Sequence, residues 1–246
     1  MAPPFLAYYG VATNNDTTLK EAVNQCLLYR QILHTNTTAN AHPPETHAPV
    51  TSGLWQHIIG PGGDHGLWST GNAWAAAGMT RVLATLLKAP IGLCGSWKQE
   101  AVKHLTKTIQ EILNTVICNP KDTNDLVRNY IDDSSWFGEV SGSSLFASVA
   151  YRISTMSPML ALNGYTLEPD DIIKYITFAE GVRKTLGNGQ HVSSNGTVFP
   201  AINPLNWGDR KPFTQGSPEG NNFVVLLYAA WRDCIRAGIP GCQAAF

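Results

Sequence analysis

The sequence has few charged residues, and the two signs nearly cancel. Asp, Glu, Lys and Arg make up 14% of its 246 residues, against about 25% in an average soluble domain, and the formal net charge is −1. Without a basic field, the chain is not expected to bind nucleic acid or an acidic membrane surface. It also lacks an apolar run of the roughly 20 residues that span a bilayer. One arginine in a pocket could still bind an anionic substrate.

Motifs for metal, cofactor and nucleophile chemistry are also missing. The sequence contains no P-loop, GxGxxG, HExxH or GxSxG motif. Its five cysteines form no CxxC pair and no Cys/His metal spacing. We therefore expect neither a metal nor a cofactor.

Cysteines and glycosylation sequons bear on localisation. Cys26, Cys118 and Cys234 fall in helical patterns and are interpreted as buried apolar residues, while a Cys234–Cys242 bridge would fit a secreted protein. Three sequons also favour secretion: Asn15, Asn36 and Asn195. Residues 1–5 lack the basic and apolar regions of a signal peptide. We expect the full-length protein to be secreted.

What the sequence does contain is helical periodicity. Six segments combine apolar residues at three–four spacing with helix start and stop signals: 17–33, 71–88, 97–118, 142–155, 168–186 and 218–236. Residues 1–12 look like a further helix already under way. Strand-like alternation is scarce, and short strands could form only at 191–193 and 197–199.

Two kinds of helix alternate along the chain. The segments starting near residues 71, 142 and 218 are rich in Ala, Gly and Ser, and each follows a loop with Gly, Ser, Trp or Glu; the other three are ordinary amphipathic helices. Closely packed inner helices favour small side chains, whereas outer helices are half solvated. The pattern predicts an all-α fold, a partial (α/α)6 barrel of about seven helices alternating inner and outer. A solenoid of helix pairs is the alternative, but these units match only at their junctions.

A closed six-hairpin barrel needs twelve helices. Residues 1–246 are therefore predicted to form a single six-hairpin glycosidase-like domain that is incomplete at its N-terminus. An open barrel exposes the apolar flanks of its end helices, so we expect poor solubility or self-association through them.

Candidate ligand-binding residues concentrate in residues 54–74. Tryptophan faces stack on the apolar faces of sugars, and His and Asn side chains bond their hydroxyls. The candidates are His57, Trp68, Asn72 and Trp74. Structural alternatives remain open: Trp74 could be a core residue, and His57 a satisfied structural histidine.

The neighbouring acidic residues have competing interpretations. Asp64 and His65 lie in a glycine-rich loop and are interpreted as surface residues. Glu139 follows aromatic residues that could raise its carboxyl pKa, but it could equally be a helix-entry anion with Ser141 as the N-cap. Glu219 lies at a good helix start, and Trp207 could rim the same opening.

Residues 68–79, Trp-Ser-Thr-Gly-Asn-Ala-Trp-Ala-Ala-Ala-Gly-Met, resemble the Trp-x-Arg-Gly-Asn-Gly-Trp element of the unsaturated rhamnogalacturonyl hydrolases. Residues 3–10 and 137–143 also resemble fungal members of this family. The resemblance implies a secreted (α/α)6-barrel glycosidase that acts on the unsaturated uronyl oligosaccharides left by pectin lyases. It implies that an Asp protonates C4 of the C4=C5 double bond, water adds at C5, and the resulting hemiketal opens without a covalent enzyme intermediate.

The resemblance also implies roles for particular residues. His57, Trp68, Asn72 and Trp74 match pocket positions, with Trp68 stacking on the sugar and His57 bonding the sugar or the attacking water. Glu139 falls at another inner-helix entry with a less defined role. Thr70 and Glu139 are further candidates for substrate binding, and Glu139 is the candidate for the catalytic acid.

Two departures affect activity and substrate. The family's general acid lies in a Trp-x-Asp element upstream of the stretch matching residues 1–4, and it has no counterpart in this sequence. Thr70 replaces an Arg that can hold the uronate carboxylate, and a hydroxyl cannot substitute for a bidentate guanidinium. A catalytically inactive carbohydrate-binding remnant is therefore the alternative to a hydrolase. A helical structural protein, with Trp68 buried, is a third reading.

Overall fold

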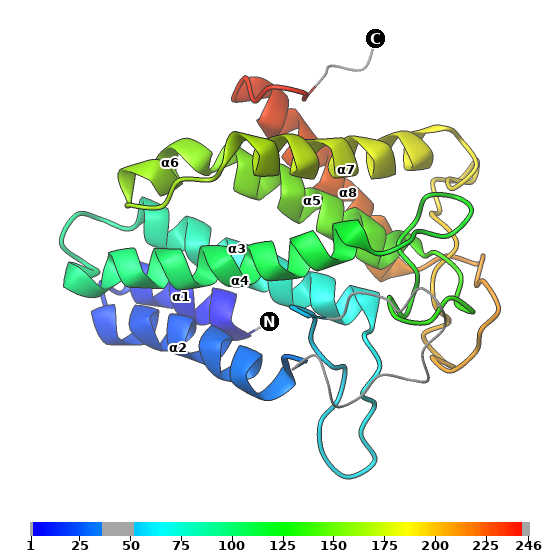
Figure 1. The fold of residues 1–246 in the computed structure, drawn as a ribbon, viewed down its shortest axis with the longest axis horizontal. Coiled ribbons are helices and arrows are strands. Elements are labelled where there is room, and N and C mark those ends of the chain that lie inside the picture. The colour runs from blue at the N-terminus through cyan, green and yellow to red at the C-terminus, as the bar shows by residue number, and fades with distance from the viewer. Residues whose placement is uncertain (1, 36–51, 243–246) are drawn as a thin grey trace.

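The computed structural model describes residues 2–35 and 52–242 (Figure 1). The α-helices are α1 (Ala2–Ala12), α2 (Asp16–Leu33), α3 (Ser69–Lys88), α4 (Lys98–Cys118), α5 (Val140–Thr155), α6 (Ser157–Leu162), α7 (Pro169–Gly187) and α8 (Pro218–Arg236), and a 3-10 turn, η1 (Gly95–Trp97), precedes α4. The described residues form no β-strand, only isolated bridges.

The helices form an inner and an outer layer. In the inner layer α1 contacts α3, α3 contacts α5, and α5 contacts α8. On the outside α2 packs on α1, α4 on α3, and α7 on α5. Burial follows these positions: α5 is buried along almost its whole length, whereas α4 buries one stripe of apolar residues and exposes the rest. The predicted alternation of inner and outer helices is confirmed.

The predicted helix boundaries agree with the structure within a few residues. One helix was not predicted, and one predicted strand pair is not formed. The short α6 was not predicted, because its six residues are too few to show a helical period. The predicted strand pair around Asn195-Gly196 is only a tight turn with a single bridge between Val192 and Val198. Gly196 turns it with a φ of 82°, a value that favours glycine.

The starts of α3, α5 and α8 meet at one end of the layers. The long connections 52–68, 119–139 and 188–217 gather at this end (Figure 1). Backbone bonds join them: Ser69 N donates to the Asn129 carbonyl at 2.8 Å, and Val140 N donates to the Pro200 carbonyl at 2.9 Å. The three loop motifs recognised in the sequence therefore lie together.

The entry of α5 is fixed by a buried acid. Glu139 is the N-cap, and its carboxylate accepts hydrogen bonds from Ser141 N at 2.6 Å and Gly142 N at 2.5 Å. One interpretation of the sequence made Ser141 the N-cap, and the structure shows that Glu139 has this position instead. A side chain on Gly142 would place its Cβ 2.6 Å from Ser69 Oγ, so the glycine is what lets α5 approach α3.

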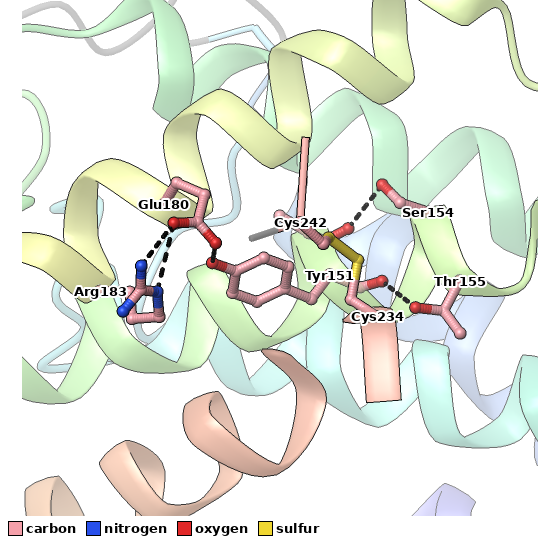
Figure 2. The surroundings of a disulfide bond; sticks show 8 residues. Tyr151, Ser154, Thr155, Glu180, Arg183, Cys234 and Cys242 are labelled. Carbon is pink, nitrogen blue, oxygen red and sulfur yellow. Dashed lines mark hydrogen bonds and ion pairs between the residues drawn. A yellow bond between two sulfur atoms is a disulfide. The ribbon is translucent and has the colours of Figure 1, made fainter. Parts of the chain in front are cut away.

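A disulfide ties the end of the described chain to α8. Cys234 is bonded to Cys242, as considered from the sequence, and the bond lies near Tyr151 of α5 (Figure 2). Tyr151 OH donates to Glu180 Oε1 at 2.7 Å, and Glu180 also pairs with Arg183 at 2.7 Å. The Tyr151–Glu180 hydrogen bond joins α5 to α7.

Cys118 corrects one prediction, because it is exposed at the end of α4 rather than buried. In the part of the chain that the structure covers, no helix combines the length and apolar character needed to cross a membrane.

Candidate functional site

An aromatic cluster lies where α3, α5 and α8 begin. Trp68, the residue before α3, is at its centre. The Trp68 ring lies 4.6 Å from the His57 ring and 5.2 Å, edge-on, from the Trp74 ring, measured between centroids. Trp207, on the connection before α8, meets His57 edge-on at 6.2 Å. The structure thus brings together His57, Trp68 and Trp74, three of the residues singled out from the sequence.

A cavity opens against this cluster and is called the aromatic pocket below. It encloses about 210 Å³ and is lined by His57, Trp68, Asn129, Tyr130, Ile202 and Trp207. Sites for drug-sized ligands usually span about 300–1,000 Å³, so this volume suits one small ring. Flat indole walls with a few polar groups are well suited to a sugar.

His57 is oriented by Asp64. The His57 Nδ1 to Asp64 Oδ2 distance is 2.9 Å, and Tyr130 OH donates to the same carboxylate oxygen. An ionised carboxylate only accepts hydrogen bonds, so Nδ1 carries a hydrogen, and in that tautomer of the imidazole Nε2 is left as the acceptor. Asp64 was interpreted as a surface residue; it is partly buried and holds the pocket histidine.

Electrostatics support an ionised Asp64. Burial raises its pKa, but hydrogen bonds from Tyr130, His57 and Gly66 N lower the pKa by more than burial raises it, and the net shift is downward. Burial and the adjacent Asp64 raise the pKa of Tyr130, which therefore keeps its proton and remains a donor.

Two other predicted residues, Asn72 and Thr70, do not line the aromatic pocket. Asn72 is buried; its Oδ1 accepts from Trp55 N at 2.7 Å, and its Nδ2 donates to the Trp55 carbonyl at 2.9 Å. Thr70 is buried and donates to Glu139 Oε1 at 2.9 Å. In this structure Asn72 fixes the strand-like segment that carries His57, and Thr70 helps to fix the start of α5.

Glu139 has no exposed surface, and its carboxylate accepts four hydrogen bonds. Besides the two amides of α5 and Thr70, Ser69 Oγ donates to it at 2.9 Å. Burial raises the pKa of Glu139, while these bonds lower it. This arrangement links the starts of α3 and α5. Its substrate-binding and catalytic roles stay predictions.

Glu219, in the first turn of α8, is a second carboxyl in this region. Burial and the nearby Glu139 raise its pKa, and a hydrogen bond from Trp74 partly offsets the rise. Trp74 is itself 41% exposed and packs against Trp68. Through Trp74, Glu219 is connected to the aromatic cluster.

Sequence reasoning missed Asn129, Tyr130 and Ile202, which complete the aromatic pocket. They lie in loops without periodicity, and their positions depend on pairing between distant segments, such as the Trp68–Tyr130 bridge. No local signal could have identified them. Among the described residues, no group of three or more His, Cys, Asp or Glu is arranged to hold a metal.

Solved structures share this fold. A possible member of the GH105 family from Salmonella enterica serovar Paratyphi A matches with a TM-score of 0.67 and 19% identity over 92% of this chain and 53% of its own. A glycosyl hydrolase family 88 protein from Bacteroides vulgatus matches with a TM-score of 0.64 and 16% identity over 96% of this chain and 60% of its own. An unsaturated glucuronyl hydrolase specific for heparin matches with a TM-score of 0.65 and 13% identity over 95% of this chain and 58% of its own.

The chain thus spans little more than half the length of these structural relatives. No curated protein matches it. The model of Glycosyl Hydrolase Family 88 matches residues 1–153, which include α1 to α4, most of α5, the His57–Asp64 pair and Trp68. The chain therefore belongs to Glycosyl Hydrolase Family 88.

Proposed function

We propose that this chain is a glycoside hydrolase for unsaturated uronyl oligosaccharides such as pectin lyases release. In the proposed reaction an acid donates a proton to C4 of the C4=C5 double bond and water adds at C5. The hemiketal formed in this way opens and releases the remaining sugar. The observation that carries the proposal is the aromatic pocket, in which Trp68 and His57 lie 4.6 Å apart and Asp64 orients the imidazole.

Trp68 provides the binding surface in this proposal. Its Nε1 donates to Asn129 Oδ1 at 3.1 Å, which holds the indole plane in place. An apolar face fixed in this way can stack on the flattened ring of an unsaturated uronyl group. Trp207 meets His57 edge-on, also lines the aromatic pocket and would border the bound sugar.

His57 positions the attacking water. With Nδ1–H bonded to Asp64, the His57 Nε2 atom can accept a hydrogen bond from water and draw its proton as the C5–O bond forms. Such orientation of a histidine by a carboxylate is common among catalytic bases. Asp64 remains ionised and does not take the proton itself.

The proton for C4 needs a carboxylic acid. Glu139, the candidate from the sequence, is enclosed by four donors and would have to break some of these bonds to reach a ligand. Glu219 is only half-buried, and its raised pKa favours a held proton. Between these two carboxyls, Glu219 is better suited to proton donation in the described residues.

The proposal extends to localisation. The Cys234–Cys242 disulfide fits an oxidising compartment, and pectin-derived substrates occur outside the cell. We therefore propose that the protein is secreted.

A binding titration tests the proposal. The purified chain is titrated with an unsaturated uronyl disaccharide and with its saturated counterpart, while tryptophan fluorescence is recorded. Saturable quenching that is lost in Trp68→Ala would support sugar binding in the aromatic pocket. Trp97→Phe, which replaces a tryptophan of η1, is the control and should keep the quenching. Equal affinity for both disaccharides would contradict recognition of the double-bonded ring.

A further inference from the structure

Asn129 lies in the aromatic pocket with both backbone groups engaged. Its N–H donates to the Phe137 carbonyl at 2.9 Å, and its carbonyl accepts from Ser69 N at 2.8 Å. The residue is 1% exposed and lines the aromatic pocket. The backbone of this pocket-lining residue is therefore held in place by both neighbouring segments.

The orientation of the Asn129 amide follows from its partner. Trp68 Nε1–H is a donor only, and it lies 3.1 Å from Asn129 Oδ1. The oxygen must therefore face Trp68, and the two hydrogens of Nδ2 point elsewhere. The alternative orientation would place two donors against each other.

Asn129 Nδ2 has no acceptor. Within the described residues, no hydrogen-bond partner reaches this buried atom. Buried polar groups in native proteins are almost always paired, so an unpaired buried donor in a residue that lines a cavity marks a candidate partner for a ligand oxygen.

The acceptor that fits best follows from what the pocket lacks. No Lys or Arg lines the aromatic pocket, and the hydroxyl of Thr70 is already bonded to Glu139. Tyr130 OH donates to Asp64, so it is not available either. A carboxylate is an acceptor only and is the strongest acceptor that a uronyl group carries.

We propose that Asn129 is a substrate-binding residue whose Nδ2 donates to the carboxylate of the uronyl group stacked on Trp68. This inference rests on the proposed function. The Asn129 amide would give the pocket an uncharged hydrogen-bond donor for the carboxylate, in place of the guanidinium that the family has at the position of Thr70.

The replacement Asn129→Asp tests this directly, because it keeps an oxygen for Trp68 and replaces the free donor with an acceptor. We expect the dissociation constant for an unsaturated galacturonyl disaccharide to rise roughly 10- to 100-fold at pH 7, measured by calorimetry. At about pH 4.5 the buried acid becomes protonated and can donate, so the loss should shrink. A loss of affinity of the same size at both pH values would contradict hydrogen-bond donation by this side chain.

Asn129→Leu provides a second variant that adds no charge, and it should bind weakly at both pH values. Asn14→Asp, in the exposed turn between α1 and α2, is the matched control and should bind like the wild type. Cooperative melting identifies folded variants. Wild-type affinity in both folded Asn129 variants would overturn the inference. Absence of binding by the wild type would instead refute the proposed function.

Discussion

His57 depends on Asp64 for the hydrogen position that the proposed water activation requires. Asp64→Asn would put an amide where the carboxylate now accepts from His57 Nδ1, Tyr130 OH and Gly66 N. No orientation of the amide satisfies all three donors. We expect turnover to fall by about 10²-fold or more, because general-base catalysis contributes about 10²–10⁴-fold. Steady-state kinetics measure this, and unchanged kcat would contradict the role given to His57.

Glu219 makes stability depend on pH. Its pKa is raised by burial and by Glu139, so the folded state binds the proton more tightly than the unfolded state. The stability that this contributes is present below the ordinary pKa of glutamate and is lost as pH rises through the raised value. Glu219→Gln removes this loss. The melting temperature of the variant relative to the wild type should therefore increase with pH, and a constant difference between pH 4 and pH 8 would contradict the shift.

At the residue scale, the sequence predicted the aromatic part of the site better than its polar part. Trp and His in a short segment indicate a sugar site by their chemistry alone, and His57, Trp68 and Trp74 do lie together. Asn129 could not be found because one asparagine in a loop carries no signal until the Trp68 contact is known. The burial of Thr70 behind Glu139 likewise depends on how α3 and α5 meet.

At the scale of helices, the crossing of α3 and α5 depends on Gly142. Its Cβ would lie 2.6 Å from both Glu139 Oε1 and Ser69 Oγ, two atoms held by hydrogen bonds. Gly142→Ala should therefore lower the free energy of unfolding by about 1–3 kcal/mol. Gly181→Ala, in α7 with open space around the new methyl group, should instead raise it by up to about 1 kcal/mol. Urea denaturation of both variants measures the contrast, and an equal effect would contradict the close approach.

Helix positions were predictable because each inner or outer helix is long enough to show its apolar period and has a distinct start. The residues 169–187 illustrate this, with Pro169 at the first position and Asp170 and Asp171 in the first turn. α6 has only six residues, and the turn at 191–199 is held by contacts rather than by strand propensity. Short elements of this kind depend on tertiary packing, which local sequence does not encode.

At the scale of the molecule, α1 and α2 present an exposed apolar surface that includes Phe5, Tyr9 and Ile32. We propose that this surface mediates self-association. The double variant Phe5→Gln/Tyr9→Gln should lower the mass measured by light scattering at high concentration, whereas Ile91→Gln, at a fully exposed position between α3 and α4, should not. A wild-type mass that stays monomeric at every concentration would contradict the proposal.

The measurement that tests the central claim most directly follows the ultraviolet absorbance of the C4=C5 double bond. Pectin-lyase oligosaccharides are mixed with the purified chain, with His57→Ala and with buffer. The proposed function predicts that the absorbance falls with the wild type and falls much more slowly with the variant. A flat trace from a wild-type chain that melts cooperatively would contradict hydration of the double bond by this chain.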